Sequence, residues 1–144
     1  MGSITIIKAS GLGSGGSDVT PSALDWDDIT TTQIYLGLGD NSGSEQTLAA
    51  IDAVIQIKAA WTSTSSSPAK GVWVKNGAEV GDYVSTPAYV NATVGDKLYF
   101  LMRSRNVFGE GNYDTGTVTV TNESDGAATL DTFTFEVQYV YSTS

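Results

Sequence analysis

Three carboxylates around one tryptophan form the first group in this sequence that could do chemistry. The stretch "ALDWDDIT", residues 23–30, places Asp25, Asp27 and Asp28 beside Trp26. A glycosidase needs two carboxylates that flank a glycosidic bond, and Asp25 and Asp27 would project to the same side of an extended chain. However, acids next to a threonine run are usually turn and surface residues. We therefore interpret Trp26 as a packing anchor, and the acids as residues that keep its surroundings soluble or meet a basic partner.

The chain contains no histidine and no cysteine. This excludes a Ser-His-Asp triad and a Cys-His pair, and it removes the commonest general base and zinc ligand. We therefore predict a protein that is not an enzyme, with no cofactor and no metal site. Loops at 40–45 and 122–125 carry oxygen ligands that could suit calcium, but neither has the EF-hand spacing and both consist of ordinary turn formers.

The charge of the chain limits its partners. Its 144 residues carry a formal net charge of −9 and only seven basic side chains. Nucleic acids and anionic membrane surfaces both require clustered lysine and arginine, so we expect neither as a partner. No segment approaches the roughly 18 apolar residues of a membrane span. The N-terminal "MGSITIIKAS" lacks the pattern of a Sec signal, so we expect synthesis and folding in the cytoplasm, with export by a different route as the alternative.

Aromatic side chains are the second candidate for function, since exposed rings can stack on sugars. Phe108 and Tyr113 fall in the glycine-punctuated stretch 106–116, which we predict to be a loop whose tip contacts a partner or ligand. We assign Trp61 to the core as a second structural anchor. The aromatic residues in predicted hairpins and loops are Trp73, Tyr83, Tyr89, Phe108 and Tyr113.

Alternating β-branched and aromatic residues predict that strands position these groups. Residues 47–62 would also suit a helix, but Ile55, Ile57, Ala59 and Trp61 alternate with polar or small residues and favour a strand over 53–62. The dipeptide Asn76-Gly77 predicts a type I′ hairpin turn, because both central residues need a positive φ. Further strands are predicted at 29–39, 71–75, 90–94, 98–103, 117–122 and 130–142.

The N-terminal residues are predicted to form an arm. Ile4, Ile6 and Ile7 precede a Gly/Ser-rich linker at 9–18, which has almost no capacity to pack. Such an apolar segment is expected to add to a sheet, either of the same chain or of a neighbouring copy. We therefore divide the chain into an arm and linker, residues 1–18, and a β-sandwich domain, residues 19–144.

About seven or eight strands separated by turns predict an all-β fold. The expected architecture is an antiparallel two-sheet sandwich of the immunoglobulin-like kind. The Cys…Trp…Cys spacing of antibody domains is missing.

Three segments of the sandwich domain resemble structural proteins of tailed bacteriophages. "VTPSALDWDDI" matches a P-x-x-L-x-W-x-x-I pattern found near their start, "GDKLYF" matches a hairpin of their immunoglobulin-like domains, and "GTVTVTNESDGAATLDTFTFEV" is similar to their final hairpin. The resemblance covers roughly residues 19–140. It implies a virion protein that decorates or cements a capsid, or forms part of a tail. Its partners would be other copies of itself, such as a trimer, and the major capsid or tail protein.

Other functions stay open at this point. The main alternative is a carbohydrate- or receptor-binding module of a tail or fibre, which exposed aromatic residues would favour. A bacterial adhesin-like domain would need a secretion signal or a partner strand. A hydrolase is supported only by the acidic cluster around Trp26.

Overall fold

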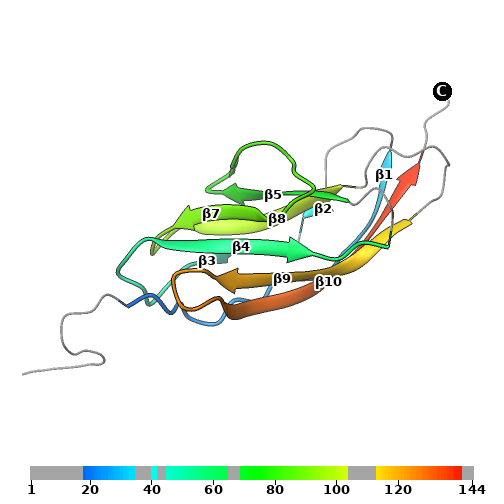
Figure 1. Cartoon of the computed structure of the whole chain (residues 1–144). Helices are drawn as coiled ribbons and strands as arrows, with labels where there is room; N and C mark the ends of the chain where they lie inside the picture. The colour runs from blue at the N-terminus through cyan, green and yellow to red at the C-terminus, as the bar shows by residue number, and fades with distance from the viewer. Residues whose placement is uncertain (1–17, 35–39, 42–44, 65–68, 104–112, 141–144) are drawn as a thin grey trace, which may run out of the picture.

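The computed structural model describes residues 18–34, 40–41, 45–64, 69–103 and 113–140. They form two β-sheets packed face to face, which confirms the predicted sandwich (Figure 1). This part of the chain contains no helix, and so no helix that could cross a membrane. The strands are β1 (Ile29–Ile34), β2 (Asp40–Asn41), β3 (Gln46–Thr47), β4 (Ile55–Trp61), β5 (Lys70–Lys75), β6 (Ala78–Glu79), β7 (Ala88–Ala92), β8 (Lys97–Arg103), β9 (Tyr113–Asn122) and β10 (Ala128–Val140).

The first sheet, sheet A, has the strand order β1-β10-β9-β4-β7, and sheet B has the order β2-β8-β5-β6, with β3 also paired to β8. The neighbours β10-β9-β4 and β3-β8-β5 repeat the G-F-C and B-E-D neighbours of an immunoglobulin sandwich. The edge strand β7 differs, because it follows the β5–β6 hairpin in the chain instead of preceding it. The paired strands β4 and β7 are therefore connected through the opposite sheet.

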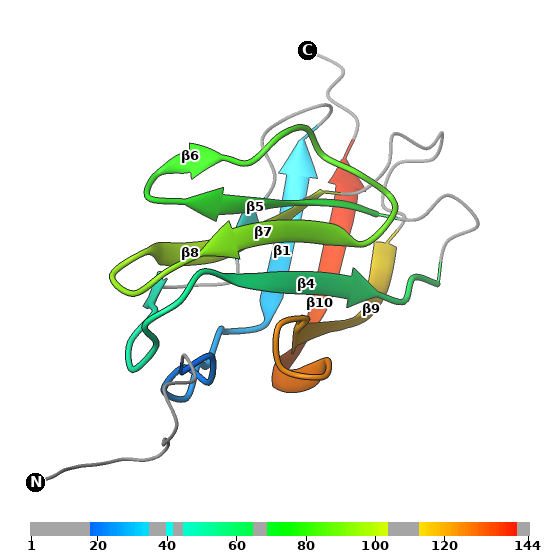
Figure 2. The ribbon, with the colours of Figure 1, turned by 60° about the vertical axis from the view of Figure 1, so that its left-hand side comes forward.

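One strand pair departs from the predicted antiparallel arrangement. Strand β1 runs parallel to β10, with Ile29 opposite Phe135. The preceding residues 18–28 bring the chain to the end of the sandwich at which β10 also begins, so both strands run the same way (Figure 2). The other strand pairs in the described part of the chain are antiparallel.

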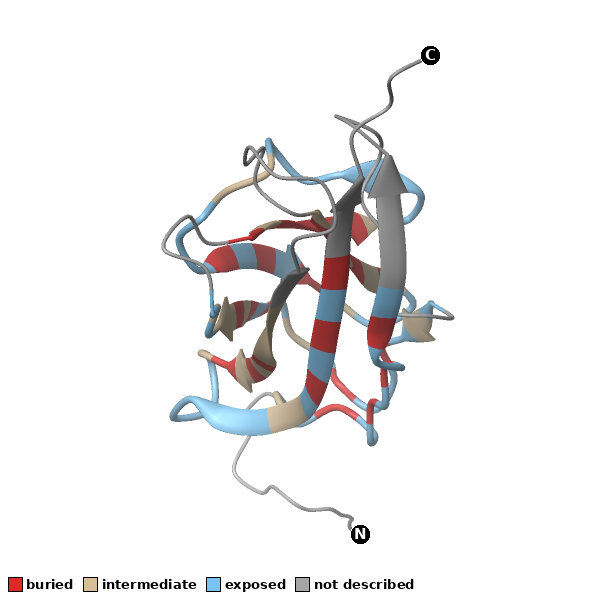
Figure 3. Cartoon of the chain, turned by 90° about the vertical axis from the view of Figure 1, so that its right-hand side faces the viewer, coloured by how far each residue is buried: buried red, intermediate tan, exposed pale blue. Residues whose placement is uncertain are grey.

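Period-2 alternation located most strands correctly. Ile55, Ile57 and Ala59 are fully buried in β4, while Gln56 is exposed, so the strand interpretation of this segment is confirmed. Figure 3 shows the same alternation of buried and exposed residues along other strands. The predicted loop over 106–116 was wrong at its end, because β9 already begins at Tyr113 and pairs there with β10.

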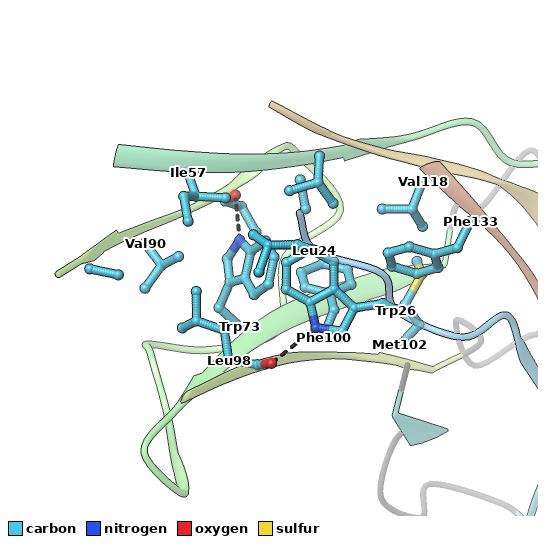
Figure 4. Packing of buried hydrophobic residues seen from close by; sticks show 14 of the residues in the cluster. Leu24, Trp26, Ile57, Trp73, Val90, Leu98, Phe100, Met102, Val118 and Phe133 are labelled. Carbon is cyan, nitrogen blue, oxygen red and sulfur yellow. Dashed lines mark hydrogen bonds between the residues drawn. The ribbon is translucent and has the colours of Figure 1, made fainter. Parts of the chain in front are cut away.

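The core contains two tryptophans that bridge the sheets. The ring of Trp73, on β5, packs edge-on against Phe100 with a centroid distance of 5.0 Å and against Trp26 at 5.6 Å. Its Nε1–H donates to the carbonyl of Ala88 in sheet A at 3.1 Å (Figure 4). The neighbours Val72 and Val74 face the other side of β5, yet both are buried. This double burial explains why the sequence pattern left the orientation of Trp73 undecided.

The turn at Asn76-Gly77 is confirmed. Asn76 has a φ of 53° and Gly77 a φ of 84°, as a type I′ turn requires. The turn joins β5 to β6, with Lys75 opposite Ala78.

Gly116 marks a close approach between chain segments. A Cβ at this position would collide with the carbonyl of Thr62, which continues beyond the end of β4. That approach allows Thr62 N–H to donate to Thr117 O at 3.1 Å and Thr64 N–H to Thr115 O at 3.0 Å. Glycine at 116 therefore allows the backbone hydrogen bonds between the β4 segment and β9 to continue beyond the end of β4.

We expect Gly116→Ala to lower the free energy of unfolding by about 1–3 kcal/mol, because an added methyl group forces the backbone apart. Urea unfolding followed by tryptophan fluorescence measures the change. Ser85→Ala, on the exposed connection between β6 and β7, is the control and should change stability by less than about 0.5 kcal/mol. Equal stability of Gly116→Ala and the unmodified protein would contradict the steric argument.

Candidate interaction surfaces

Residues 18–28, which we call the strap, cross one end of the sandwich. Ser22 N–H donates to Ala49 O at 3.0 Å, and Asp52 N–H donates to Asp18 O at 3.0 Å. The buried Asn122 donates from Nδ2 to Val19 O at 2.7 Å. These bonds tie the strap, which is blue in Figure 2, to residues 49–52 and to Asn122.

Trp26 is the buried centre of the strap, with an exposed fraction of 3%. Its backbone N–H donates to Asp131 Oδ2 at 2.7 Å, and its indole Nε1–H donates to Leu98 O at 2.9 Å. The ring lies 5.6 Å from that of Trp73 and 6.5 Å from that of Phe133, between the two sheets (Figure 4). Trp26 thus closes this end of the core, which is the position that the anchor interpretation assigns to it.

The three acids beside Trp26 lie at the surface. Asp28 Oδ1 accepts the backbone N–H of Thr134 at 2.8 Å, and the backbone N–H of Asp25 donates to Gln46 Oε1 at 3.1 Å. These contacts fasten the strap to both sheets. In the described ranges, no group of three or more acidic, histidine or cysteine side chains could hold a metal ion.

The second anchor, Trp61, lies at the margin of the core. It is partly buried, its ring packs 5.6 Å from that of Phe100, and its Nε1–H donates to Ala69 O at 2.9 Å. The indole therefore links the end of β4 to the residue before β5.

The remaining predicted contact residues either lie in a strand or fall outside the described ranges. Tyr113 is the first residue of β9, opposite Gln138, so its assignment to a loop tip was wrong. Phe108 and the arm residues Ile4, Ile6 and Ile7 lie outside the described ranges.

The outward side of sheet A is formed mainly by threonine side chains, and we call this surface the threonine face. Two pairs lie directly opposite each other on β9 and β10, namely Thr119 with Thr132 and Thr117 with Thr134. The register of the strands, which the sequence alone does not provide, brings them together. The threonine face comprises Thr30, Thr115, Thr117, Thr119, Thr121, Thr132, Thr134 and Ala60.

Charged side chains lie at the border of the threonine face and within it. Lys58 lies on one side and pairs with Glu123 at 3.9 Å, so the two charges largely cancel. Glu136 lies within the face, on β10 between Thr30 of β1 and Thr115 of β9. In a chain with a net charge of −9, this face therefore has a low charge, and Glu136 is the carboxylate that lies within it.

The structure separates the aromatic candidates. Trp73 is buried, and Arg103 lies over the ring of Tyr83 at 4.3 Å from its centroid. Tyr89 instead is 50% exposed on the edge strand β7. It lies opposite Lys58, next to the threonine face, and the neighbouring pair on the same side is Asn91 with Gln56.

Comparison with known proteins assigns neither a family nor a function to this chain. No family model matches the chain, and no curated protein matches it. Among solved structures, the N-terminal domain of PorA is similar, with 15% sequence identity and a TM-score of 0.42. The match covers 78% of this chain and 88% of the PorA chain.

We expect Trp26→Ala to lower the free energy of unfolding by about 3–5 kcal/mol, because it removes a buried ring and leaves a cavity. Thermal and urea unfolding measure the loss. Asp27→Ala, the exposed neighbour, serves as the control and should change stability by less than about 0.5 kcal/mol. A cost below about 1 kcal/mol for Trp26→Ala would show that the ring does not anchor the strap.

Proposed function

We propose that the protein is a non-enzymatic structural component of a phage virion, and specifically a capsid decoration or cement protein. It would contact other copies of itself and the major capsid or tail protein, and be incorporated into the particle after synthesis in the host cytoplasm. The resemblance of residues 19–140 to phage structural proteins supports this function. The threonine face is the observation on which the proposal mainly rests.

A face with little charge matters because copies of an acidic protein repel one another. Two molecules with a net charge of −9 can approach most easily through a surface with few carboxylates. The threonine face provides methyl groups for packing and hydroxyl groups for hydrogen bonds across an interface. Its central pairs, Thr119 with Thr132 and Thr117 with Thr134, carry no charge.

The size of this face suggests a further requirement. The four strands that carry it, β1, β10, β9 and β4, lie about 4.8 Å apart and span roughly 14 Å, and about five residues along each strand span roughly 17 Å. The area that these two lengths enclose is smaller than the roughly 800 Å² per partner of a standard interface. Stable assembly therefore needs additional contacts, and the apolar arm with Ile4, Ile6 and Ile7 would supply them by adding a strand to a neighbour.

We expect the full chain to form an oligomer whose molar mass falls when residues 1–17 are removed or when Thr119→Asp places a charge on the threonine face. Light scattering on a size-exclusion column measures the mass over a range of protein concentrations. Ser85→Asp, which adds the same charge on the exposed β6–β7 connection, is the control and should leave the oligomer intact. A monomer for the full chain at all concentrations would contradict self-assembly through these surfaces.

A second candidate function, a carbohydrate- or receptor-binding module of a tail or fibre, is favoured by Tyr89. An exposed ring can stack on a sugar, and the adjacent Asn91 and Gln56 can hydrogen-bond with its hydroxyl groups. The pairing of Lys58 with Glu123 leaves the surroundings nearly neutral, which suits an uncharged saccharide.

For this candidate, we expect Tyr89→Ala to lower affinity for a neutral glycan identified on a glycan array by up to about tenfold, since packing against an aromatic ring contributes about 0.5–1.5 kcal/mol. Isothermal titration calorimetry gives the affinities. Val94→Ala, which alters another exposed apolar side chain beyond the end of β7, is the control. If no neutral glycan binds, or if Tyr89→Ala binds as well as the unmodified protein, the module function is contradicted.

A further inference from the structure

Two turns at the same end of the sandwich are joined by the side chain of Asn76. Its Oδ1 accepts the backbone N–H of Lys97 at 2.9 Å, and its Nδ2–H donates to Asp96 Oδ1 at 2.9 Å. The backbone N–H of Asn76 also donates to Lys97 O at 2.8 Å. The type I′ turn between β5 and β6 is thereby fastened to the turn that leads from β7 into β8.

Asp96 is the central residue of this junction. Besides the Asn76 amide, its carboxylate accepts Thr93 N–H through Oδ2 at 2.9 Å, and its carbonyl accepts Leu48 N–H at 2.9 Å. Hydrogen bonds from Asn76 and Thr93 hold the pKa of Asp96 below its ordinary value of 3.8. The carboxylate is therefore ionised and available to Asn76 at neutral pH.

The residue after Asn76 makes its amide chemically vulnerable. Gly77 has no side chain to shield its backbone nitrogen, and the space where a Cβ would lie is open. That nitrogen can attack Cγ of Asn76, with release of ammonia and formation of a five-membered succinimide. Water then opens the ring to aspartate or isoaspartate, so an amide is lost and a carboxylate gained without any oxidant or other reactant.

We propose that Asn76-Gly77 is a deamidation site at which the contact with Asp96 restrains the reaction in the folded protein. Ring closure requires the Asn76 side chain to turn onto the Gly77 nitrogen. Both ends of that amide are held by residues 96 and 97, so these hydrogen bonds must break first. The local contact, and not the stability of the whole sandwich, sets the rate.

Deamidation would also change the junction itself. An aspartate at 76 cannot donate to Asp96 Oδ1, and it would place a second carboxylate at hydrogen-bonding distance from the first. An isoaspartate would in addition insert a backbone methylene into a two-residue turn. Either product would release the β5–β6 turn from the β7–β8 turn.

The rate experiment compares the full-length protein with Asp96→Ala and Gly116→Ala at neutral and mildly alkaline pH. Deamidation is followed by mass spectrometry of peptides and by isoaspartate detection, with Asn91 and Asn122, neither followed by glycine, as internal controls. We expect Asp96→Ala to deamidate about tenfold faster at Asn76, because a hydrogen bond to a charged group shifts a local equilibrium by about that factor or more. Gly116→Ala, which weakens a distant part of the sandwich, should react at the original rate. An unchanged rate in Asp96→Ala, or equal acceleration in Gly116→Ala, would overturn the proposal.

The effect of the product is tested with Asn76→Asp, using Asn76→Gly as the control that keeps the turn but lacks the side chain. At neutral pH, Asn76→Asp should melt at a lower temperature than Asn76→Gly because of carboxylate repulsion. Acidification should then change the stability of the unmodified protein and of Asn76→Asp in opposite directions. In the unmodified protein the contribution of ionised Asp96 is lost as pH falls through its lowered pKa, whereas in Asn76→Asp protonation relieves repulsion. A difference between the two variants that does not shrink on acidification would contradict the predicted contact.

Discussion

The fold depends on a cluster of three aromatic rings, packed edge-on, that joins the strap to sheet B. Trp26 comes from the strap, Trp73 from β5 and Phe100 from β8, and consecutive rings in this order lie 5.6 and 5.0 Å apart. Each indole N–H also donates to a backbone carbonyl, Leu98 O for Trp26 and Ala88 O for Trp73. Because a buried indole needs such a partner, these bonds fix where the rings can lie. The strap is therefore part of the core, although it belongs to no strand.

This constraint explains which parts of the fold the sequence could predict. Alternation over a few residues is a local signal, and it was sufficient for β4, for the buried face of β8 and for the turn at Asn76-Gly77. The partner of Trp26 was not predictable, because Asp131 lies 105 residues further along the chain. The parallel pairing of β1 with β10 was missed for the same reason, since it depends on the path of the strap. In β9, the glycines around residues 109–116 suggested a loop, whereas Gly116 lies in the strand and permits close backbone contact.

The candidate surfaces were even harder to predict from the sequence. Threonines on β9 and β10 are visible as alternating residues, but only the register places Thr119 opposite Thr132. A shift by one residue would turn these side chains inward. Tyr89 could not be distinguished from Tyr83 by its neighbours in the chain. The distinction arises because Arg103 from β8 covers the ring of Tyr83, while Tyr89 lies at a sheet edge.

The distribution of charge connects the fold with the proposed assembly. Many acids of this chain serve the backbone: Asp28, Asp96 and Asp131 each accept at least one backbone N–H from a turn, the strap or a strand. Such carboxylates stabilise the ends of the sandwich and leave the middle of sheet A to threonine. A chain that needs acids at its ends can therefore still keep most of one broad face free of charge. That separation would let copies associate through sheet A while the acidic ends keep them soluble, and so it gives a physical reason for a low-charge face in a strongly acidic protein.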